Sequence, residues 1–333
     1  DVHLHSSAQN LRAIEFSQHD IRIRNGRFHA TSHVACGTGG SAGAAQGGAG
    51  GAGGGTSSGG SSSGAGGAGG NEPSCPNVLS CAAAPPDPGA AGEWVHFSSS
   101  ITAQSFANHR GRDMFYNPGD THWVMGKFAY GLIDDDLQDE DVDIYLNRDC
   151  AADWELITTL RTTSDGDHPT VEGVEDTGGW IFYDASSLNL LPGRHRFRLV
   201  VRGDLTATET FIDVVPSGMP LIVSDIDGTL TTSENEEFTA LLTGSLPNPN
   251  PSSAQVLTAL AEQGYRIFYL TARPHFLGAR SREFLATNGY PLGLVHTSLS
   301  LTGATGQAAA DYKTAELEAI AARGLVPSWA FGN

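Results

Sequence analysis

Basic side chains are scarce in this 333-residue sequence. Lysine and arginine total 19 against 37 aspartates and glutamates, which gives a formal net charge of −18. Nucleic-acid binding depends on a basic surface that displaces counterions, so this balance argues against nucleic acid as a partner. It argues equally against general electrostatic adhesion to anionic lipid. Any phosphate that the protein binds must therefore be held by local contacts.

Long apolar runs and paired cysteine motifs are also missing. No stretch approaches the ~18 consecutive apolar residues that a membrane-spanning helix needs. The four cysteines, Cys36, Cys75, Cys81 and Cys150, have no C-x-x-C spacing of the kind that binds zinc. Cys75 and Cys81 are near enough to close a small disulfide loop in an oxidising compartment, and free thiols fit the sequence equally well.

The N-terminal region has the composition of a tether. Residues 37–70 contain only Gly, Ala, Ser, Thr and Gln, and residues 71–91 add five prolines. Such segments bury too little apolar surface to offset chain entropy, so we predict a disordered region and linker over residues 1–91. Cys36 precedes the tether and is similar to the lipidated cysteine of a bacterial lipoprotein, which favours a cell-envelope or secreted location. An incidental cysteine is the alternative.

Residues 92–217 show short alternating runs separated by turn sequences. The runs are WVHF, THWVMGKFAY, VDIYLN, WELITTL, WIFY, HRFRLVV and ATETFIDVV. Regularly spaced short strands are typical of an antiparallel sandwich, so we predict an all-β sandwich of immunoglobulin-like type. The acidic run from Asp134 to Asp143 lacks the glycine and final glutamate of an EF-hand, and we predict a solvated loop there.

Residues 218–333 alternate between apolar strands and helical patterns. The strand candidates are PLIVSDI, RIFYL, LGLVHT and SWAFG, and the helix candidates are SSAQVLTALAEQ, PHFLGARSREFLATNG and AAADYKTAELEAIAARG. Continuous apolar strands joined by helices form a parallel sheet covered on both faces. We therefore predict a Rossmann-like α/β domain.

Two aspartates directly follow the first of these strands. Asp225 and Asp227 are two residues apart, so on extended backbone both side chains point the same way, and Gly228 permits a sharp turn after them. Ligands of open α/β sheets bind beyond the carboxyl ends of the strands. Paired carboxylates at one site indicate a shared cation or divided acid–base duties. Both fit magnesium-dependent phosphoryl transfer through an aspartyl-phosphate.

The residues around these aspartates resemble a known family. DIDGT after a buried strand resembles the D-x-D-G-T signature of the haloacid dehalogenase-like phosphatases. SDIDGTLTTSE together with YLTARPHFLGARSREFL resembles the LNS2 domain of lipin-type phosphatidate phosphatases and of some phosphatidylinositol-transfer proteins. The resemblance covers about residues 218–333 and implies a parallel sheet of the haloacid dehalogenase type.

The resemblance implies a role for each matching residue. Asp225 would be the nucleophile and Asp227 the general acid and base, and both would bind Mg²⁺, Asp227 through its backbone carbonyl. The phosphate would be held by Gly228, Thr229, Thr271 and Lys313. Thr271 would also lie where the backbone opens a helix, whose N-terminus favours an anion.

Other interpretations of the same residues stay open. Thr271 is equally a candidate helix cap, and Lys313 a candidate partner of Glu316 on its own helix. A further acidic metal ligand of the family would follow the G-N turn at Asn333, where the sequence stops.

The spacing and the arginines bear on the substrate. The intervals from Asp227 to Thr271 and from Thr271 to Lys313 leave no room for a cap domain, so the site is expected to be open. Arg273 and Arg282 are candidate headgroup contacts, because arginine makes forked contacts with phosphate. These features predict a magnesium-dependent phosphomonoester hydrolase acting on phosphatidate or a related phospholipid, with membrane-surface association. The alternatives are an LNS2 module that binds phosphatidate or a phosphoinositide without catalysis, and a sandwich that acts as a protein-binding domain.

Overall fold

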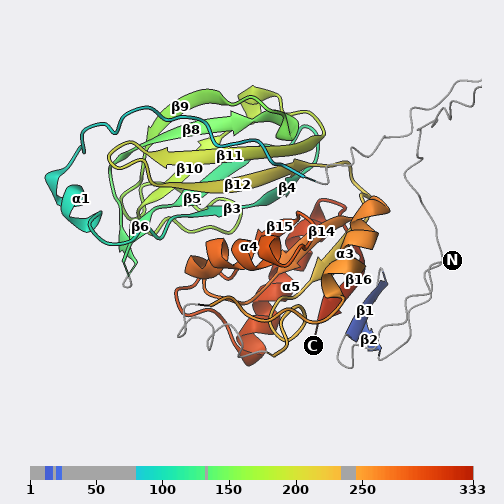
Figure 1. Ribbon diagram of the computed structural model, residues 1–333. Coiled ribbons are helices and arrows are strands. Elements are labelled where there is room, and N and C mark those ends of the chain that lie inside the picture. Colours follow the sequence, from blue (N-terminus) through green and yellow to red (C-terminus); the bar gives the residue numbers. More distant parts are fainter. Residues whose placement is uncertain (1–11, 18–19, 25–79, 132–133, 234–244, 333) are drawn as a thin grey trace, which may run out of the picture.

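A computed structural model describes residues 12–17, 20–24, 80–131, 134–233 and 245–332. A β-sandwich packs against an α/β domain in this structure (Figure 1). The predicted boundaries at residues 91/92 and 217/218 fall outside all strands and helices, and they stay a prediction. Among the described residues no helix is long and apolar enough to cross a membrane.

The sandwich consists of two main sheets. One has the order β10-β5-β3 and the other β4-β12-β11-β8-β9, while β6 and β7 form a small separate pair. Every pairing is antiparallel except the parallel pairing of β12 with β4. The strands are β3 (Arg110–Arg112), β4 (Met114–Tyr116), β5 (Trp123–Lys127), β6 (Ala129–Tyr130), β7 (Asp135–Asp136), β8 (Asp141–Asn147), β9 (Glu155–Arg161), β10 (Trp180–Asp184), β11 (Gly193–Val201) and β12 (Ala207–Val214).

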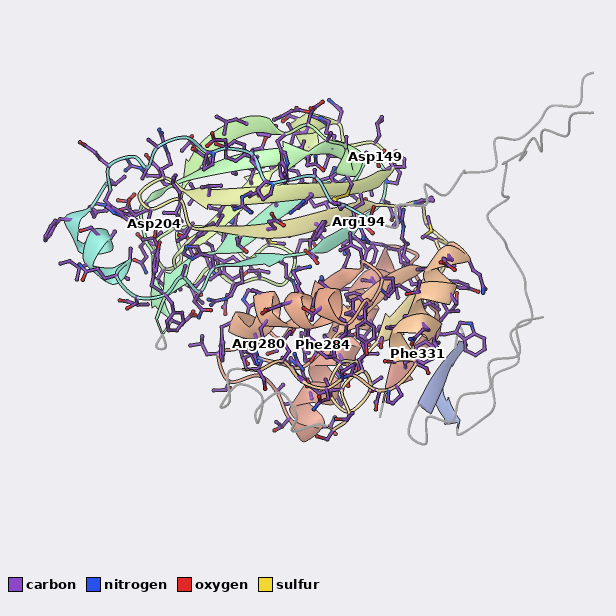
Figure 2. The ribbon with its side chains drawn as sticks, in the orientation of Figure 1. Asp149, Arg194, Asp204, Arg280, Phe284 and Phe331 are labelled. Carbon is purple, nitrogen blue, oxygen red and sulfur yellow. A yellow bond between two sulfur atoms is a disulfide. The ribbon has the colours of Figure 1, made fainter. Side chains whose placement is uncertain are left out.

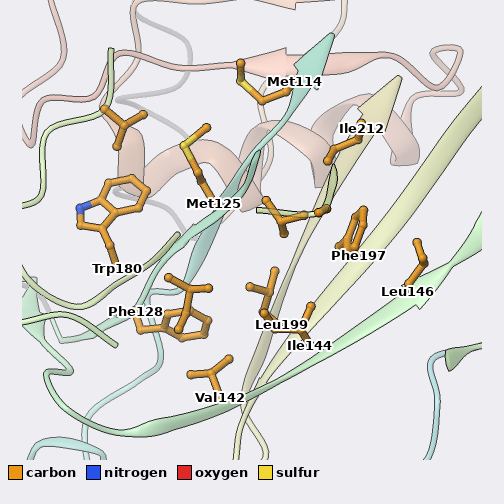
Figure 3. Packing of buried hydrophobic residues seen from close by; sticks show 14 of the residues in the cluster. Met114, Met125, Phe128, Val142, Ile144, Leu146, Trp180, Phe197, Leu199 and Ile212 are labelled. Atoms are coloured by element: carbon orange, nitrogen blue, oxygen red, sulfur yellow. The ribbon is translucent and has the colours of Figure 1, made fainter. Parts of the chain in front are cut away.

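The sandwich core follows from the alternation along its strands. In β11, Phe197 and Leu199 belong to the buried cluster between the sheets, whereas Arg196 and Arg198 lie on the other face and pair with Glu209. Figure 3 shows side chains from both sheets meeting in this cluster. The predicted all-β sandwich is confirmed.

Two details of the sandwich differ from the prediction. Residues 94–97, predicted as a strand, instead lead into a short helix, α1 (Phe97–Thr102). Strands β3 and β4 were not predicted, because the segment that forms them carries Arg110, Arg112 and Asp113 and does not alternate. Two further helical turns, η1 (Arg148–Cys150) and η2 (Ser186–Leu188), connect strands.

The α/β domain has a six-stranded sheet of order β15-β14-β13-β16-β1-β2. The first four strands are parallel, β1 pairs antiparallel with β16, and β2 pairs antiparallel with β1 at the edge. The elements are β13 (Leu221–Ser224), α3 (Ser253–Glu262), β14 (Arg266–Leu270), η3 (His275–Leu277), α4 (Gly278–Thr287), β15 (Leu294–His296), α5 (Gly306–Ala322), β16 (Pro327–Gly332), β1 (Arg12–Ser17) and β2 (Asp20–Arg24). The predicted Rossmann-like sheet is confirmed.

Two buried clusters cover the faces of this sheet. On one face, Leu257 of α3 and Phe284 of α4 pack with Tyr269. Figure 2 labels Phe284 on α4. On the other face, Ile320 of α5 packs in the same cluster as Phe115 of the sandwich. The sandwich therefore covers part of the sheet directly and shares a core with it.

The N-terminal region is described only in part. Strands β1 and β2 were not predicted, since residues 1–91 were expected to lack regular structure. Cys36, Cys75 and the Gly-rich residues 37–70 lie outside the described residues. The lipid anchor predicted at Cys36 therefore stays a prediction.

Part of the predicted linker lies along the sandwich. Cys81 forms a disulfide with Cys150, so neither alternative left open by the sequence, a Cys75–Cys81 loop or a free thiol, holds for Cys81. The indole of Trp154 donates a hydrogen bond to the carbonyl of Ala84 at 2.7 Å. The sequence did not reveal this disulfide because its two cysteines are 69 residues apart.

The acidic run is not simply a solvated loop. Asp134 pairs with Arg110, and both side chains are buried. Asp136 lies 2.6 Å from the ammonium of Lys127, whose side chain is also buried. Asp135 is exposed, whereas Glu140 is buried and accepts the backbone amides of Val95 and His96. Two of the acids therefore neutralise buried cations of the sandwich.

Candidate functional site

The candidate site forms where the parallel strands of the α/β domain end. Strand β13 is followed by Asp225, whose amide still donates to the carbonyl of Phe331 in β16 at 2.9 Å. Strand β14 is followed by Thr271, whose amide donates to His296 at the end of β15, also at 2.9 Å. The parallel registers thus place these strand ends at one edge of the sheet.

Asp225 is paired with a lysine from the last helix. The ammonium of Lys313, in α5, lies 2.5 Å from Oδ2 of Asp225. Oδ1 of the same carboxylate accepts the backbone N–H of Ile226 at 2.8 Å. Burial raises the pKa of Asp225 above its ordinary value and Asp227 adds to the rise, while Lys313 and the Ile226 amide oppose it. The alternative interpretation paired Lys313 with Glu316 on its own helix, but Lys313 pairs with Asp225 instead.

Asp227 is held by an arginine and a threonine. The guanidinium of Arg273 reaches both carboxylate oxygens, with Nη2 2.7 Å from Oδ1 and Nε 2.9 Å from Oδ2. The hydroxyl of Thr271 donates to Oδ2 at 3.1 Å. The Arg273 side chain is only 3% exposed and also donates to Ser281 at 3.1 Å. Arg273, predicted as a headgroup contact, therefore neutralises Asp227 in this structure.

The turn after Asp227 satisfies most of its own polar groups. Gly228 has a φ of 68°, which favours glycine, and its amide donates to the hydroxyl of Thr231 at 2.9 Å. The amides of Thr229 and Leu230 both donate to the carbonyl of Ile226. The hydroxyl of Thr229 differs, because it is buried and has no hydrogen-bond partner among the described residues. A buried hydroxyl without a partner is costly, so a ligand oxygen that reached the turn would satisfy Thr229 Oγ1.

Two predicted features are not found at this edge. Arg282 lies 2.6 Å from Oδ2 of Asp113 in the sandwich and over the ring of Phe211, so its guanidinium is engaged between the domains. Thr271 does not open or cap a helix, since η3 begins only at His275 and α4 at Gly278. The predicted headgroup contact of Arg282 and the helix N-terminus at Thr271 receive no support from the structure.

Two residues that shape the turn were not singled out in the sequence. Thr231 accepts the Gly228 amide, and the side-chain amide of Asn250 donates to the carbonyls of Thr229 and Thr231 at 2.7 and 2.9 Å. Thr231 belongs to the hydroxyl run after DIDGT, which was a usable signal. Asn250 is about twenty residues away from the turn in the sequence, and no sequence signal pointed to its role.

The donor set does not fit a resident magnesium ion. All four carboxylate oxygens of Asp225 and Asp227 already accept hydrogen bonds from Lys313, Arg273 or the backbone. No group of three or more His, Cys, Asp or Glu side chains that could hold a metal occurs among the residues described. A cation at this edge would have to displace an amine or a guanidinium, so Mg²⁺ binding stays a prediction.

The predicted open site is consistent with the described chain. Between Asp227 and Thr271 the described residues form a turn, α3 and β14, with residues 234–244 outside the described part. Between Thr271 and Lys313 they form η3, α4, β15 and the start of α5. No cap domain occurs in either described interval.

Comparison with known proteins gives two adjacent matches. Residues 222–333 match the family described as "PITM 1-3, LNS2 domain", and residues 107–214 match "PITM 1-3, beta-sandwich domain". Among solved structures, a polysaccharide deacetylase from Bacillus cereus aligns with 66% of this chain and 68% of its own at 9% identity, but its TM-score of 0.22 carries no argument.

Individual relatives match more than half of this chain. Protein retinal degeneration B of Drosophila melanogaster is 28% identical over 61% of this chain and 15% of its own length. Membrane-associated phosphatidylinositol transfer protein 3 of Mus musculus is 26% identical, with coverages of 62% and 20%, and protein 2 is 30% identical, with coverages of 57% and 13%. The chain thus spans a fifth or less of each relative's length.

The prediction of a magnesium-dependent phosphatase is wrong. Two of these relatives are phosphatidylinositol transfer proteins by name, and none of the three is named as a phosphatase. The site geometry supplies a physical reason. A general acid must deliver a proton to the leaving oxygen, but both oxygens of Asp227 already accept hydrogen bonds from Arg273.

Proposed function

Since the chain carries an LNS2 domain behind a β-sandwich domain, we propose that it binds the headgroup phosphate of an anionic phospholipid without turning it over. Phosphatidate and phosphoinositides share this phosphate chemistry. Two relatives are named as membrane-associated phosphatidylinositol transfer proteins, which supports phospholipid recognition and association with membranes.

The observation that carries this proposal is the position of Lys313. Helix α5 delivers its ammonium to the edge of the sheet, where it lies 2.5 Å from Asp225 and remains 29% exposed. A lysine ammonium has three donors, so it can contact a phosphate oxygen while keeping one hydrogen bond to Asp225. The protein is acidic overall, so it must hold a phosphate by local contacts. The partly exposed ammonium of Lys313 at the strand ends supplies such a contact.

The neighbouring groups complete the binding site. Arg273 neutralises Asp227, and Lys313 neutralises Asp225, so the two acids do not present a net negative charge to the ligand. The unpartnered hydroxyl of Thr229 offers a donor for a second phosphate oxygen. One ammonium, one hydroxyl and a neutralised pair of acids suit an anion that arrives from solvent or from a membrane surface.

The proposal is tested by vesicle co-sedimentation of the Lys313→Met variant. Vesicles contain phosphatidylcholine alone or with added phosphatidate, phosphatidylinositol or phosphatidylinositol 4-phosphate. We expect the parent chain to bind the anionic vesicles and the variant to bind them about 10- to 100-fold more weakly, because a hydrogen bond to a charged group contributes about 1.5–3 kcal/mol. Since the donor set does not fit magnesium, the parent is expected to bind equally in EDTA.

A charge-matched variant separates this site from general electrostatics. Arg161→Met removes one positive charge from β9 of the sandwich, where the side chain is 54% exposed, and should leave binding unchanged. Equal losses in both variants would contradict a specific site, as would a parent chain that binds phosphatidylcholine vesicles just as tightly. The lipid arms decide between phosphatidate and the phosphoinositides.

Replacing Asp225 with asparagine is expected to strengthen binding about tenfold, because the Lys313 ammonium then no longer has its positive charge neutralised by a carboxylate. Stability should rise as well. A carboxyl whose pKa is raised in the folded state contributes stability below its unfolded pKa and loses it as pH rises. The variant should therefore be more stable than the parent at pH 7, and the two should be equally stable below about pH 4. Weaker binding with lower stability at pH 7 would contradict this.

A further inference from the structure

The segment between β15 and α5 exposes two leucines. Leu299 is 36% exposed and Leu301 is 53% exposed. The only other exposed large hydrophobic side chain among the described residues of this domain is Val326, just before β16. Because β16 is parallel to β13, Val326 lies at the amino edge of the sheet, opposite the candidate site. The two leucines follow β15, so they lie at the carboxyl edge.

Hydrogen bonds fix this segment against the candidate site. The amide of Ser298 donates to the carbonyl of Arg273 at 3.0 Å, and the amide of His275 donates to Ser300 at 3.1 Å. The amide of Ala304 donates to the carbonyl of Ala272 at 2.9 Å. The segment is therefore bound on both sides of the leucines to the stretch that carries Arg273.

The segment also lacks charge. Residues 297–310 contain no Asp, Glu, Lys or Arg, in a chain whose net charge is −18. An anionic bilayer repels acidic surfaces, so a face that approaches it must be free of acids. Leucine side chains flanked by small hydroxyl residues suit the boundary between headgroups and acyl chains, where apolar side chains are buried and hydroxyls stay hydrated.

We propose that the segment 297–305 contacts the phospholipid bilayer and inserts Leu299 and Leu301 at its headgroup boundary. The inference rests on the proposed function, since a lipid whose phosphate is held at Lys313 keeps its acyl chains in the bilayer. The bilayer surface must then lie against this edge of the sheet. The leucines lie at the same edge of the sheet as the proposed headgroup site, which favours a membrane over a protein as the partner of this surface.

The test compares vesicles with a lipid that forms no bilayer. The Leu299→Ser/Leu301→Ser double variant is expected to bind phosphatidate vesicles about tenfold more weakly, since it loses the burial of about one leucine side chain. Its affinity for monomeric dihexanoyl phosphatidate, below its micelle concentration, should equal that of the parent. Phenylalanine at both positions should restore vesicle binding. Val326→Ser, in the same domain, and Leu191→Ser, which changes a 74% exposed leucine of the sandwich, should have no effect.

The outcomes separate this inference from the proposed function. If Lys313→Met loses both lipid forms and the leucine variant binds vesicles like the parent, the membrane-contact inference is wrong and the headgroup site stands. If Lys313→Met binds both forms normally, the proposed function fails. Loss of both lipid forms in the leucine variant, with an unchanged unfolding midpoint, would make the leucines part of the headgroup site and overturn membrane insertion.

Discussion

Replacing Asp113 with alanine is expected to lower the free energy of unfolding by about 3–5 kcal/mol, as breaking a buried ion pair does. Asp113 lies between β3 and β4 and is fully buried. Oδ1 accepts the amide of Phe211 within the sandwich at 2.8 Å. Oδ2 accepts the amide of Val295 at 2.9 Å and lies 2.6 Å from the guanidinium of Arg282, both in the α/β domain. Alanine would leave these donors buried without their acceptor.

The measurement is denaturant unfolding followed by far-UV circular dichroism and by tryptophan fluorescence. Asp113→Asn keeps one acceptor oxygen and should fall between the parent and Asp113→Ala. Asp135→Ala, at an exposed position of β7, should change stability by less than about 0.5 kcal/mol. Because Phe115 of the sandwich packs in one cluster with Phe268 of β14, the parent should unfold in one transition. A loss below 1 kcal/mol in Asp113→Ala would show that the domain contact contributes little.

The α/β domain was predictable because its signals are local. Each strand from β13 to β16 is a short apolar run, and each helix carries a periodic pattern within one stretch of sequence. The i, i+2 spacing of Asp225 and Asp227 indicated that both side chains point the same way at a strand end. Thr271 and Lys313 were singled out by the resemblance to the LNS2 domain, and the structure places them beside Asp227 and Asp225.

The partners of the arginines were not predictable, because they depend on how the domains pack. In the sequence, Arg282 is indistinguishable from a solvated arginine on a helix. Only the packing of the sandwich places Asp113 beside it. In the sequence, Arg110 and Arg112 suggest an exposed loop rather than a buried strand. Their burial is stabilised by acidic partners that are distant in sequence. These partners are Asp134 for Arg110 and Glu316 for Arg112. Because these charged residues are buried only at the domain interface, neither strand β3 nor the interface could be predicted from the sequence.

The ion pair between Arg112 and Glu316 links this interface to the candidate site. Nη2 of Arg112 in β3 lies 2.5 Å from Oε1 of Glu316 in α5, and both side chains are largely buried. Oε2 of Glu316 lies 2.6 Å from Nδ1 of His296. Glu316 follows Lys313 by three residues, one helical turn, so the two side chains lie on neighbouring parts of α5. The sandwich thus holds the helix that delivers Lys313 to Asp225.

A double-mutant cycle on this pair is expected to be strongly non-additive. Arg112→Met or Glu316→Leu alone leaves a buried charge without its partner and should cost about 3–5 kcal/mol. The double variant should regain at least about 2 kcal/mol relative to the sum of the singles, because no buried charge is left unpaired. Additive losses would show that the two side chains do not interact in solution.

The pH dependence of the Glu316 variant gives a second readout of the pair. Burial alone would raise the pKa of Glu316, but Arg112 and His296 outweigh it and hold the pKa well below the ordinary value. A carboxyl with a lowered pKa contributes stability above its unfolded pKa of about 4.3 and loses it as pH falls. The stability difference between the parent and Glu316→Leu should therefore be full at pH 7 and shrink below about pH 4. If phosphatidate binding by Glu316→Leu also falls while Asp135→Ala binds normally, α5 transmits the state of the domain interface to Lys313.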